Sequence, residues 1–367
     1  MTAVNYPAAD YSGRIRRVRE IMGEHGIDVL LLSVGSDLPY LSGYEAMPLE
    51  RLTMGVVTRT EAVLVVPQLE APRVIDRGVF EVVPWAETED PIGIVRRLIG
   101  ASQRAAVGAQ TWARFLVEMQ EAMPTTRFTD ATAVMRPLRV VKDEEEIELL
   151  GRAGAAVDTV VERLRAMSFG GRTEAELARE VMEMTVAAGH ETATFHIVAS
   201  GPNAASPHHE PGTRSIRQGD CVVVDFGGRL GGYCSDTTRT FHVGEPPADF
   251  AEAFDALRAA QLAGTAAAGP GVAAQDVDRA ARRVLDDAGW GRWFIHRTGH
   301  GIGLDAHEDP YLVDGNTELL QPGMTFSIEP GVYVTGKWGM RIEDIVVCTA
   351  DGRATLNNSP RDLAIVE

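Results

Sequence analysis

Residues 221–241 read Cys-Val-Val-Val-Asp-Phe-Gly-Gly-Arg-Leu-Gly-Gly-Tyr-Cys-Ser-Asp-Thr-Thr-Arg-Thr-Phe. Two runs rich in β-branched and aromatic residues flank a Gly-Gly-Arg-Leu-Gly-Gly turn, which is typical of a β-hairpin. Antiparallel pairing about this turn places Asp225 and Asp236 nearly opposite each other. Like charges that face each other across two strands destabilise the pair. Two explanations stay open here: a cation lies between the carboxylates, or a bulge turns one of them to solvent.

The composition indicates an ordinary globular protein without a polyanionic partner. The chain has 367 residues, enough for two domains, and 45% of them are hydrophobic and 24% charged. With 35 basic and 52 acidic side chains, the formal net charge is −17. Nucleic acid and anionic membrane surfaces would repel such a chain, so we expect neither as a partner.

The chain also lacks the sequence features of a membrane or secreted protein. No apolar run approaches the roughly 18 residues that a membrane span needs, and the first ten residues do not resemble a signal peptide. The three cysteines, Cys221, Cys234 and Cys348, have no metal-binding spacing, and we expect reduced thiols. These features predict a cytoplasmic protein.

Residues 1–138 are predicted to form an α/β domain, because strand and helix patterns alternate along them. A helix is expected over residues 10–26 and a buried strand over residues 27–32, followed by a packed loop at residues 36–44. Further strands are expected at residues 54–58, 62–66, 79–83 and 105–107, and further helices at residues 69–77 and 92–99.

The second domain is predicted to cover residues 139–367. Pro137 indicates a break in structure, and the acidic residues 143–146 favour the start of a long helix that ends near Met167. The domain is expected to be α+β, with helices on one side of a curved, mainly antiparallel sheet. Its other expected helices are 173–189 (with Thr173 and Glu176 as a capping box), 250–268 and 277–289, and its expected strands are 194–199, the hairpin, 325–329 and 341–348.

Five of the nine histidines fall in two short segments. They are His208 and His209 in one segment, and His296, His300 and His307 in the other. Glycines at positions 299, 301 and 303 would let the backbone approach another group closely. The spacing matches neither a zinc-binding helix nor a dinucleotide loop, and a simple tight turn at residues 300–303 is the alternative.

Two glutamates lie in apolar strand patterns further along the chain. Glu329 ends the run Thr-Phe-Ser-Ile-Glu, and Glu343 lies in Met-Arg-Ile-Glu-Asp-Ile-Val-Val. Strand alternation puts Arg341 on the same face as Glu343. The pair is either an exposed ion pair or a buried one, and the irregular pattern of the neighbouring isoleucines favours burial. Buried carboxylates need partners.

Together these groups form a candidate metal-binding set. It consists of Asp225, Asp236, Glu329, Glu343 and His300. Four carboxylates balance the charge of two divalent cations. A ligand set rich in oxygen suits Mn²⁺, with Co²⁺, Fe²⁺ or Zn²⁺ as alternatives, and disfavours a thiolate-type zinc site. Two such ions can share a hydroxide and stabilise a hydrolytic transition state.

This ordered set resembles the dinuclear metallopeptidases of the pita-bread fold. The flanks are V-V-D-F-G, S-D-T-T-R-T, T-G-H-G-I-G-L, S-I-E-P-G and R-I-E-D, and they are most similar to the Xaa-Pro branch, aminopeptidase P and prolidase. The resemblance is strong over residues 140–360. Residues 10–135 resemble the creatinase/prolidase-type N-terminal domain more weakly, through residues 39–44 and 62–67.

The resemblance implies a role for each matching residue. The five residues named above would bind two metal ions, and Glu329 would also act as general base or proton shuttle. His208 and His307 would lie at the scissile carbonyl, and His296 and Arg341 would line the substrate pocket. Relatives are commonly homodimers, in which residues near Tyr40 would reach the active site of the neighbouring subunit. His209 has no counterpart from which a role could be taken.

The function implied is metal-dependent hydrolysis of the bond between an N-terminal residue and proline, in a dipeptide or in a longer peptide. The alternatives are a hydrolase or lyase that cleaves a non-peptide C–N or C–S bond, as in an ectoine-type hydrolase, and a binding protein derived from a peptidase. Cleavage of dipeptides alone requires a group that meets the free carboxylate of the substrate. Arg214, Arg297 and Arg341 are candidates for that group.

Overall fold

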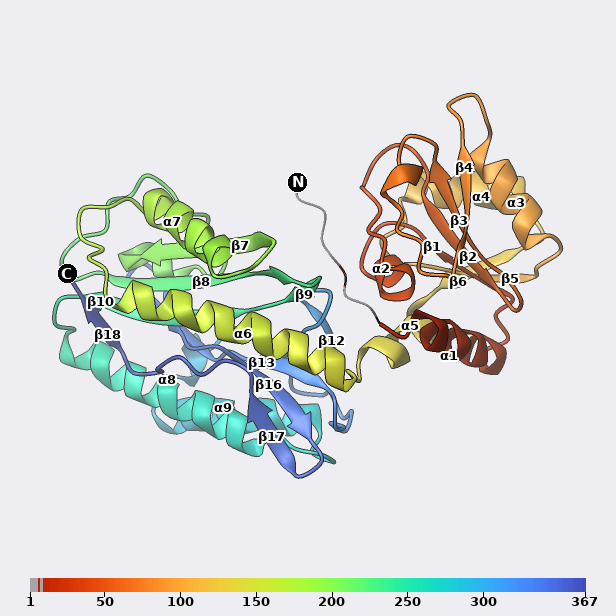
Figure 1. The fold of residues 1–367 in the computed structure, drawn as a ribbon. Coiled ribbons are helices and arrows are strands. Elements are labelled where there is room, and N and C mark those ends of the chain that lie inside the picture. Colours follow the sequence, from red (N-terminus) through yellow and green to blue (C-terminus); the bar gives the residue numbers. More distant parts are fainter. Residues whose placement is uncertain (1–5, 7–8) are drawn as a thin grey trace. The chain divides into compact units, whose positions relative to one another are not determined.

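The protein is described by a computed structural model that covers residue 6 and residues 9–367. The chain forms two compact units, one ending at Arg139 and the other running from Val140 to Glu367 (Figure 1). The N-terminal unit contains one sheet of six strands in the order β4-β3-β2-β1-β5-β6. Its elements are α1 (Tyr11–Glu24), β1 (Val29–Leu32), α2 (Asp37–Ser42), β2 (Met54–Thr58), β3 (Ala62–Pro67), η1 (Ala71–Arg73), β4 (Glu81–Trp85), α3 (Pro91–Ile99), β5 (Arg104–Val107), α4 (Ala113–Ala122), β6 (Arg127–Asp130) and α5 (Thr132–Arg139).

Three predictions for this unit were wrong. The segment expected to be a loop contains helix α2, which begins at Asp37 and ends at Ser42, and Gly43 follows it as a left-handed cap with a backbone φ of 67°. The helix expected at residues 69–77 is only the short 3₁₀ turn η1. Pro137 does not break the structure but lies inside α5.

The C-terminal unit contains two five-stranded sheets and a separate two-stranded ribbon. The sheet orders are β18-β10-β8-β7, with β9 paired to β8, and β12-β11-β13-β16-β17, while β14 pairs with β15. The elements are α6 (Glu144–Arg165), α7 (Glu174–Ala187), β7 (Thr192–Ser200), η2 (Gly201–Ala205), β8 (Cys221–Leu230), β9 (Tyr233–Cys234), β10 (Thr237–Val243), α8 (Ala248–Ala267), α9 (Ala274–Asp287), η3 (Gly291–Trp293), β11 (Gly299–Gly301), β12 (Glu308–Leu312), β13 (Thr325–Ile328), β14 (Gly331–Val334), β15 (Trp338–Arg341), β16 (Asp344–Thr349), β17 (Gly352–Thr355) and β18 (Ala364–Val366).

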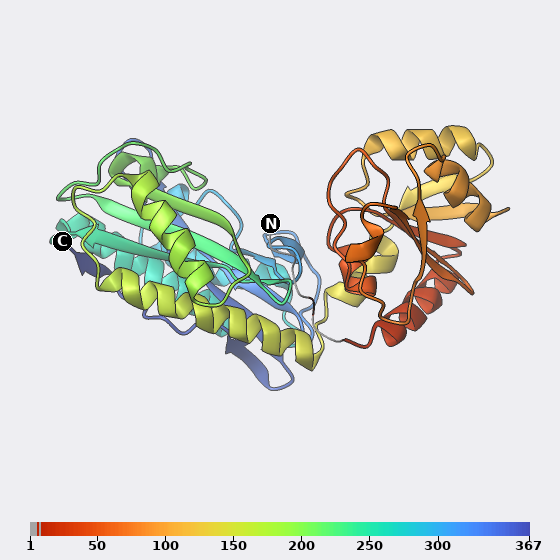
Figure 2. The ribbon, with the colours of Figure 1, turned by 45° about the horizontal axis from the view of Figure 1, so that its top comes forward.

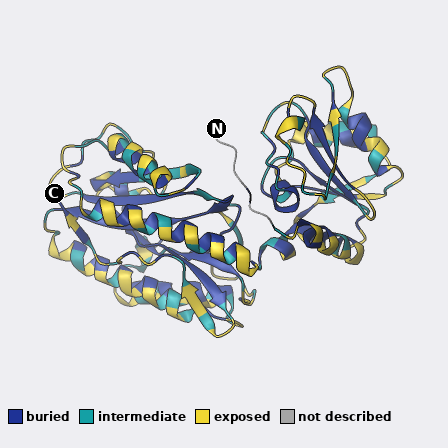
Figure 3. Cartoon of the chain, viewed as in Figure 1, coloured by how far each residue is buried: buried dark blue, intermediate teal, exposed yellow. Residues whose placement is uncertain are grey.

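Each of the two large sheets has its own buried cluster of helix and strand residues. Apolar residues of α6 and α7 form one buried cluster with β7, β8, β10 and β18, and Figure 2 shows both helices lying across this sheet. Residues of α9 form another buried cluster with β12, β13 and β16. Buried and exposed residues alternate along the helices, as expected for helices that pack on one side (Figure 3). The single sheet predicted from the sequence is therefore wrong, although the α+β class is confirmed.

The capping box predicted at the start of α7 is present. The side chain of Thr173 accepts a hydrogen bond from the backbone of Glu176, and the side chain of Glu176 accepts one from the backbone of Thr173. Among the residues that the structure describes, no helix combines the length and the apolar character needed to cross a membrane.

Candidate metal centre

The two sheets of the C-terminal unit meet at the predicted ligands. Asp225 on β8 pairs with Thr238 on β10, and Thr238 forms a bridge to Glu343, just before β16. The hydroxyl of Thr238 donates to Glu343 Oε2 at 2.6 Å. Because this threonine touches both sheets, it holds one carboxylate from each sheet at the same place.

Asp236 does not lie opposite Asp225, so the predicted register was wrong. Ser235 and Asp236 fall between β9 and β10, where the strand is interrupted, and the Ser235 hydroxyl accepts a hydrogen bond from the Gly228 N–H at 3.0 Å. This irregularity turns the Asp236 carboxylate so that its oxygen lies within 4.8 Å of ligand atoms of Asp225 and Glu343. Asp225 is 7% exposed and Asp236 is 3% exposed, so neither carboxylate faces solvent.

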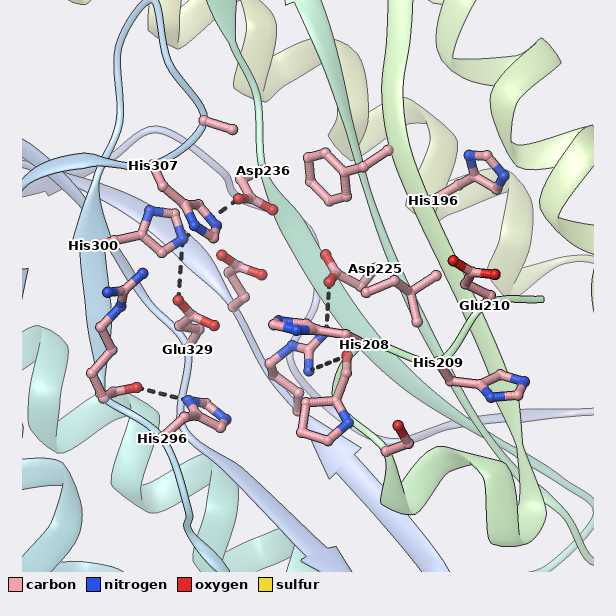
Figure 4. A pocket seen from close by; sticks show the side chains of 18 of the residues that line it. His196, His208, His209, Glu210, Asp225, Asp236, His296, His300, His307 and Glu329 are labelled. Atoms are coloured by element: carbon pink, nitrogen blue, oxygen red, sulfur yellow. Dashed lines mark hydrogen bonds and ion pairs between the residues drawn. The ribbon is translucent and has the colours of Figure 1, made fainter. Parts of the chain in front are cut away.

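His300 on β11 and Glu329 at the end of β13 complete the group (Figure 4). His300 Nδ1 lies 3.0 Å from the carbonyl oxygen of Gly301, which can only accept a hydrogen bond, so Nδ1 carries the proton. His300 Nε2 then faces Glu329 Oε1 at 3.2 Å and Asp236 Oδ2 at 3.7 Å. This tautomer leaves the Nε2 lone pair available to a metal ion.

The glycines beside His300 serve the packing of strands. A Cβ atom at Gly299 would lie 1.9 Å from the Ser327 carbonyl oxygen, and one at Gly301 would lie 2.1 Å from the Asp309 carbonyl oxygen. Only glycine permits such close backbone contacts. The close approach predicted from the sequence is therefore present, and the partner at these two positions is neighbouring backbone.

The five predicted ligands fit a divalent cation. They fall into overlapping groups of ligand atoms within 4.8 Å of one another, and His307 joins one of these groups. Asp225 Oδ1 and Glu343 Oε1 are buried and have no hydrogen-bond partner among the described residues. Buried carboxylate oxygens without a partner are costly, and a cation bound by them would remove that cost.

The electrostatics of the group point the same way. Burial raises the pKa of Asp225, and burial together with neighbouring carboxylates raises the pKa of Asp236 and Glu343 well above their ordinary values. Burial also acts to raise the pKa of Glu329, but without a metal ion a protonated His300, which then donates to it from Nε2, outweighs burial and lowers that pKa to about 2. Carboxylates that oppose one another's ionisation in this way are stabilised as anions by a cation among them.

A hydrogen-bonded chain leads from the carboxylates to His296. Arg341 donates to Asp225 Oδ2 at 2.5 Å, to the Thr238 hydroxyl at 3.0 Å and to the Tyr333 hydroxyl at 2.8 Å. The Tyr333 hydroxyl lies 3.0 Å from His296 Nε2. His296 Nδ1 lies 2.7 Å from the Arg297 carbonyl oxygen and must donate to it, so Nε2 accepts from the tyrosine. Burial lowers the pKa of His296, in keeping with this neutral ring.

Sequence analysis did not single out Tyr333. Its ring is 2% exposed, and its hydroxyl joins two residues that lie far apart in the sequence. Burial raises the pKa of Tyr333 to about 12, so the hydroxyl keeps its proton at neutral pH. A tyrosine in an apolar strand pattern carries no mark of such a role. Arg341 and Glu343, in contrast, are both buried, as the sequence favoured, but the carboxylate that Arg341 pairs with is that of Asp225.

The cluster opens into a pocket of about 1280 Å³. Its wall includes His208, His209, His296, Arg297 and His307. Burial and the nearby His300 lower the pKa of His307 to about 4, so this imidazole is neutral at pH 7. The volume exceeds the roughly 300–1,000 Å³ of common small-molecule sites, so size alone does not restrict the pocket to dipeptides.

Tyr40 belongs to α2 in the N-terminal unit, where it is 2% exposed. Its hydroxyl donates to the Leu138 carbonyl oxygen at 2.9 Å, and the guanidinium of Arg14 lies over its ring, 4.0 Å from the centroid. These contacts lie within the unit itself. The role expected for the Tyr40 region in a neighbouring subunit stays a prediction.

Comparisons with known proteins agree with this geometry. The model of metallopeptidase family M24 matches residues 148–350, and that of the creatinase/prolidase N-terminal domain matches residues 14–141. The chain is 43% identical to the probable dipeptidase PepE of Mycobacterium tuberculosis, over 100% of this chain and 99% of that protein. It is 32% identical to the Xaa-Pro dipeptidase of Lactobacillus delbrueckii subsp. lactis, over 95% and 98% of the two chains. The crystal structure of a prolidase from Thermococcus sibiricus superposes with a TM-score of 0.93 at 34% identity, covering 97% of this chain and 99% of that chain.

Proposed function

The chain belongs to metallopeptidase family M24, and we propose that it is a dipeptidase that cleaves the bond between an N-terminal residue and proline. The observation that carries this proposal is a buried cluster of four carboxylates and one histidine at the floor of a pocket walled by further histidines. Relatives named dipeptidase and Xaa-Pro dipeptidase support the choice of substrate.

We propose that Asp225, Asp236, His300, Glu329 and Glu343 hold two divalent ions, with Mn²⁺ preferred. Oxygen-rich ligand sets favour Mn²⁺ over metals that prefer thiolate ligands. Such ions supply Lewis-acid polarisation of a carbonyl and activation of water. The unpartnered oxygens of Asp225 and Glu343 support cation binding at this place.

The side chains around the floor of the pocket would transfer the protons and stabilise the oxyanion. Glu329, at the end of β13 beside His300, can accept a proton from the attacking water at a carboxylate oxygen. His307 is neutral and can donate an N–H hydrogen bond to the developing oxyanion, and His208 would lie beside the same carbonyl. Arg341 and Tyr333 would hold Asp225 and His296 in their orientations.

We propose that Arg297 meets the free carboxylate of the dipeptide. Of the three arginines considered, Arg214 is paired with Asp220 at 2.7 Å and Arg341 with Asp225 at 2.5 Å. Arg297 lines the pocket, stacks on the ring of Tyr311 at 4.3 Å and has no carboxylate partner among the described residues. A guanidinium in this state can bind a substrate carboxylate with charge-assisted hydrogen bonds.

Substrate choice and metal dependence are tested together. Amino-acid release is measured from alanyl-proline, alanyl-prolyl-glycine and alanyl-alanine, after metal stripping and again with Mn²⁺ added. We expect Mn²⁺-dependent release from alanyl-proline and little from the tripeptide. Release from the tripeptide at a similar rate would make the protein an Xaa-Pro aminopeptidase. No release from any peptide by the metal-loaded protein would contradict the proposed function and favour a non-peptide substrate.

The carboxylate contact has its own control. Arg297→Met should lower kcat/KM for alanyl-proline roughly 10- to 100-fold, because a hydrogen bond to a charged group contributes roughly 1.5–3 kcal/mol. Alanyl-proline amide lacks the carboxylate, so the substitution should change its cleavage little. An equal loss on both substrates would contradict the assignment of Arg297.

We also propose that the protein is a cytoplasmic homodimer. Its three cysteines are free and buried, which suits a reducing compartment. Light scattering tests the assembly, and a fully active monomer would contradict the dimer and the role expected for the Tyr40 region. Fractionation of the source cells tests the compartment, and recovery outside the cytoplasm would contradict it.

A further inference from the structure

A further buried carboxylate, that of Glu174, lies close to the pocket but outside the metal cluster. Glu174 is the first residue of α7, and it is 0% exposed. It accepts hydrogen bonds from the Ser200 N–H at 2.8 Å, the Ser200 hydroxyl at 2.7 Å and the Asn203 side-chain amide at 3.0 Å. A buried charge persists only where such partners satisfy it, so these contacts define a specific site for the carboxylate.

Glu174 also binds the loop that follows η2. His209 Nε2 lies 2.9 Å from Glu174 Oε2, and the Gly212 N–H donates to the same oxygen at 3.3 Å. Burial acts to raise the pKa of Glu174, but the hydrogen bonds donated by Ser200, His209 and Asn203 outweigh it and hold that pKa below its ordinary value. The carboxylate is therefore ionised, and His209 Nε2 must carry the proton that it shares with it.

The two adjacent histidines of this loop point in different directions. In Figure 4, His208 points toward the carboxylates of the metal cluster, whereas His209 points away from them. His208 is exposed and has no hydrogen-bond partner among the described residues. His208 and His307 line the same pocket. Nothing on the His208 side chain itself fixes its position.

The backbone around His208 is held on both sides. On one side the Pro207 carbonyl oxygen accepts a hydrogen bond from Arg341 at 3.4 Å, and Arg341 also binds Asp225. On the other side His209 is bound to Glu174. The contact of Pro207 is long and therefore weak. The bond between His209 and Glu174 is the stronger of the two constraints.

We propose that His209 and Glu174 form a clamp that positions the imidazole of His208 at the scissile carbonyl. The clamp rests on the proposed function, because it acts through the role of His208 in peptide hydrolysis. His209 is thus a positioning residue, since its Nε2 is bound to Glu174. A misplacement of a reacting group by about 1 Å can lower a rate roughly 10²-fold, so a tether one residue away has a large effect on turnover.

His209→Ala tests the clamp in the full-length, Mn²⁺-loaded protein. We expect the metal content to equal that of the wild type, because no metal ligand is touched. The kcat for alanyl-proline should fall roughly 10- to 100-fold with KM within a few-fold. His209→Gln places an amide N–H where Nε2 was and should restore most of the lost kcat. Glu180→Gln, which removes a half-exposed carboxylate from the same helix, is the matched control and should leave kcat unchanged.

A double-mutant cycle separates positioning from general damage. In a protein that already carries His208→Ala, the further substitution His209→Ala should lower kcat little more, because the imidazole that His209 positions is already absent. An additive loss in the double mutant, or wild-type kcat in His209→Ala, would overturn the clamp.

A measurement independent of activity completes the test. Hydrogen exchange at Ser200 and Gly212, whose N–H groups donate to Glu174, should be faster in Glu174→Gln than in the wild type. Faster exchange would support the clamp, and unchanged exchange would overturn it. Absence of peptidase activity in the wild type would instead count against the proposed function, so the two failures are distinguishable.

Discussion

The C-terminal unit consists of two halves, and both begin with a pair of helices followed by antiparallel strands. The first half runs from α6 to β10 and the second from α8 to β17. In each half, a fully buried carboxylate on the second helix binds both the N–H and the hydroxyl of a Ser or Thr. Glu174 binds Ser200 at 2.8 and 2.7 Å, and Asp278 binds Thr298 at 3.0 and 2.7 Å.

The halves differ in what this carboxylate supports. Asp278 holds Thr298, two residues before the metal ligand His300, and its partner Arg282 donates to the His296 carbonyl oxygen at 2.7 Å. Glu174 instead holds the loop that carries His208. The same arrangement therefore supports a metal ligand in one half and a pocket histidine in the other. Substitution of these two carboxylates should consequently have different effects: loss of metal affinity for Asp278 and loss of turnover for Glu174.

The largest effect is expected where the halves meet. Asp236→Ala removes a ligand from the first half and Glu343→Ala one from the second, and each should abolish metal binding and reduce hydrolysis to background. Elemental analysis of the purified variants measures the metal content. Asp255→Ala, which removes a carboxylate that is 72% exposed on α8, is the control and should keep the wild-type content. Wild-type metal content in either ligand variant would contradict a site shared by both halves.

Next in size is the loss of the pocket histidine of the first half. His208→Ala should lower kcat roughly 10²- to 10⁴-fold, the range for acid–base or oxyanion groups, and leave the metal content unchanged. Steady-state kinetics with alanyl-proline and elemental analysis of the same sample measure both quantities. Full activity would show that the first half contributes only ligands.

A smaller effect is expected from the anchor of the second half. Asp278→Ala leaves the Thr298 N–H and hydroxyl without their acceptor, which should destabilise the protein by about 1–3 kcal/mol. Because His300 follows closely, Mn²⁺ affinity should fall roughly 10- to 100-fold, while kcat at saturating Mn²⁺ stays near the wild-type value. Thermal unfolding and calorimetric titration measure these quantities. Unchanged Mn²⁺ affinity in Asp278→Ala would contradict the different roles that we assign to Asp278 and Glu174.

The smallest effect is expected at the thiols. Cys221 opens β8 in the first half and Cys348 lies on β16 in the second, and both are buried. Burial raises the pKa of Cys221 to about 11, so this thiol is not a nucleophile at neutral pH. Cys221→Ser and Cys348→Ser should leave kcat/KM within a few-fold of the wild type. Circular dichroism checks that each variant still folds. Complete loss of activity in a folded variant would show that the cysteine is required for catalysis, against this prediction.

Much of this site was accessible from the sequence because its parts are local. The five candidate ligands lie within strands or directly beside them and have distinctive flanks, and the structure brings all five together. The α7 capping box was equally local, since Thr173 and Glu176 are three residues apart. The same capping pattern explains why Glu174 was passed over, because an acid in the first helical turn usually faces solvent.

What the sequence could not supply depends on contacts between distant residues. The pairing of the Asp225 strand was misjudged because β8 continues to Leu230 and the chain turns only at residues 231 and 232, so Asp225 pairs with Thr238. Tyr333 has its role only because His296 and Arg341 both fold against its hydroxyl. The second large sheet was likewise missed because three of its strands, β11, β12 and β17, are short and were not predicted.

The measurement that tests the central claim most directly is a calorimetric titration of Mn²⁺ into the metal-free protein. Ligands from both halves converge on one cluster, so the account predicts two equivalents of Mn²⁺ per chain, and no binding in Asp236→Ala or Glu343→Ala. A single equivalent, or binding that survives both substitutions, would contradict a dinuclear centre held jointly by the two halves.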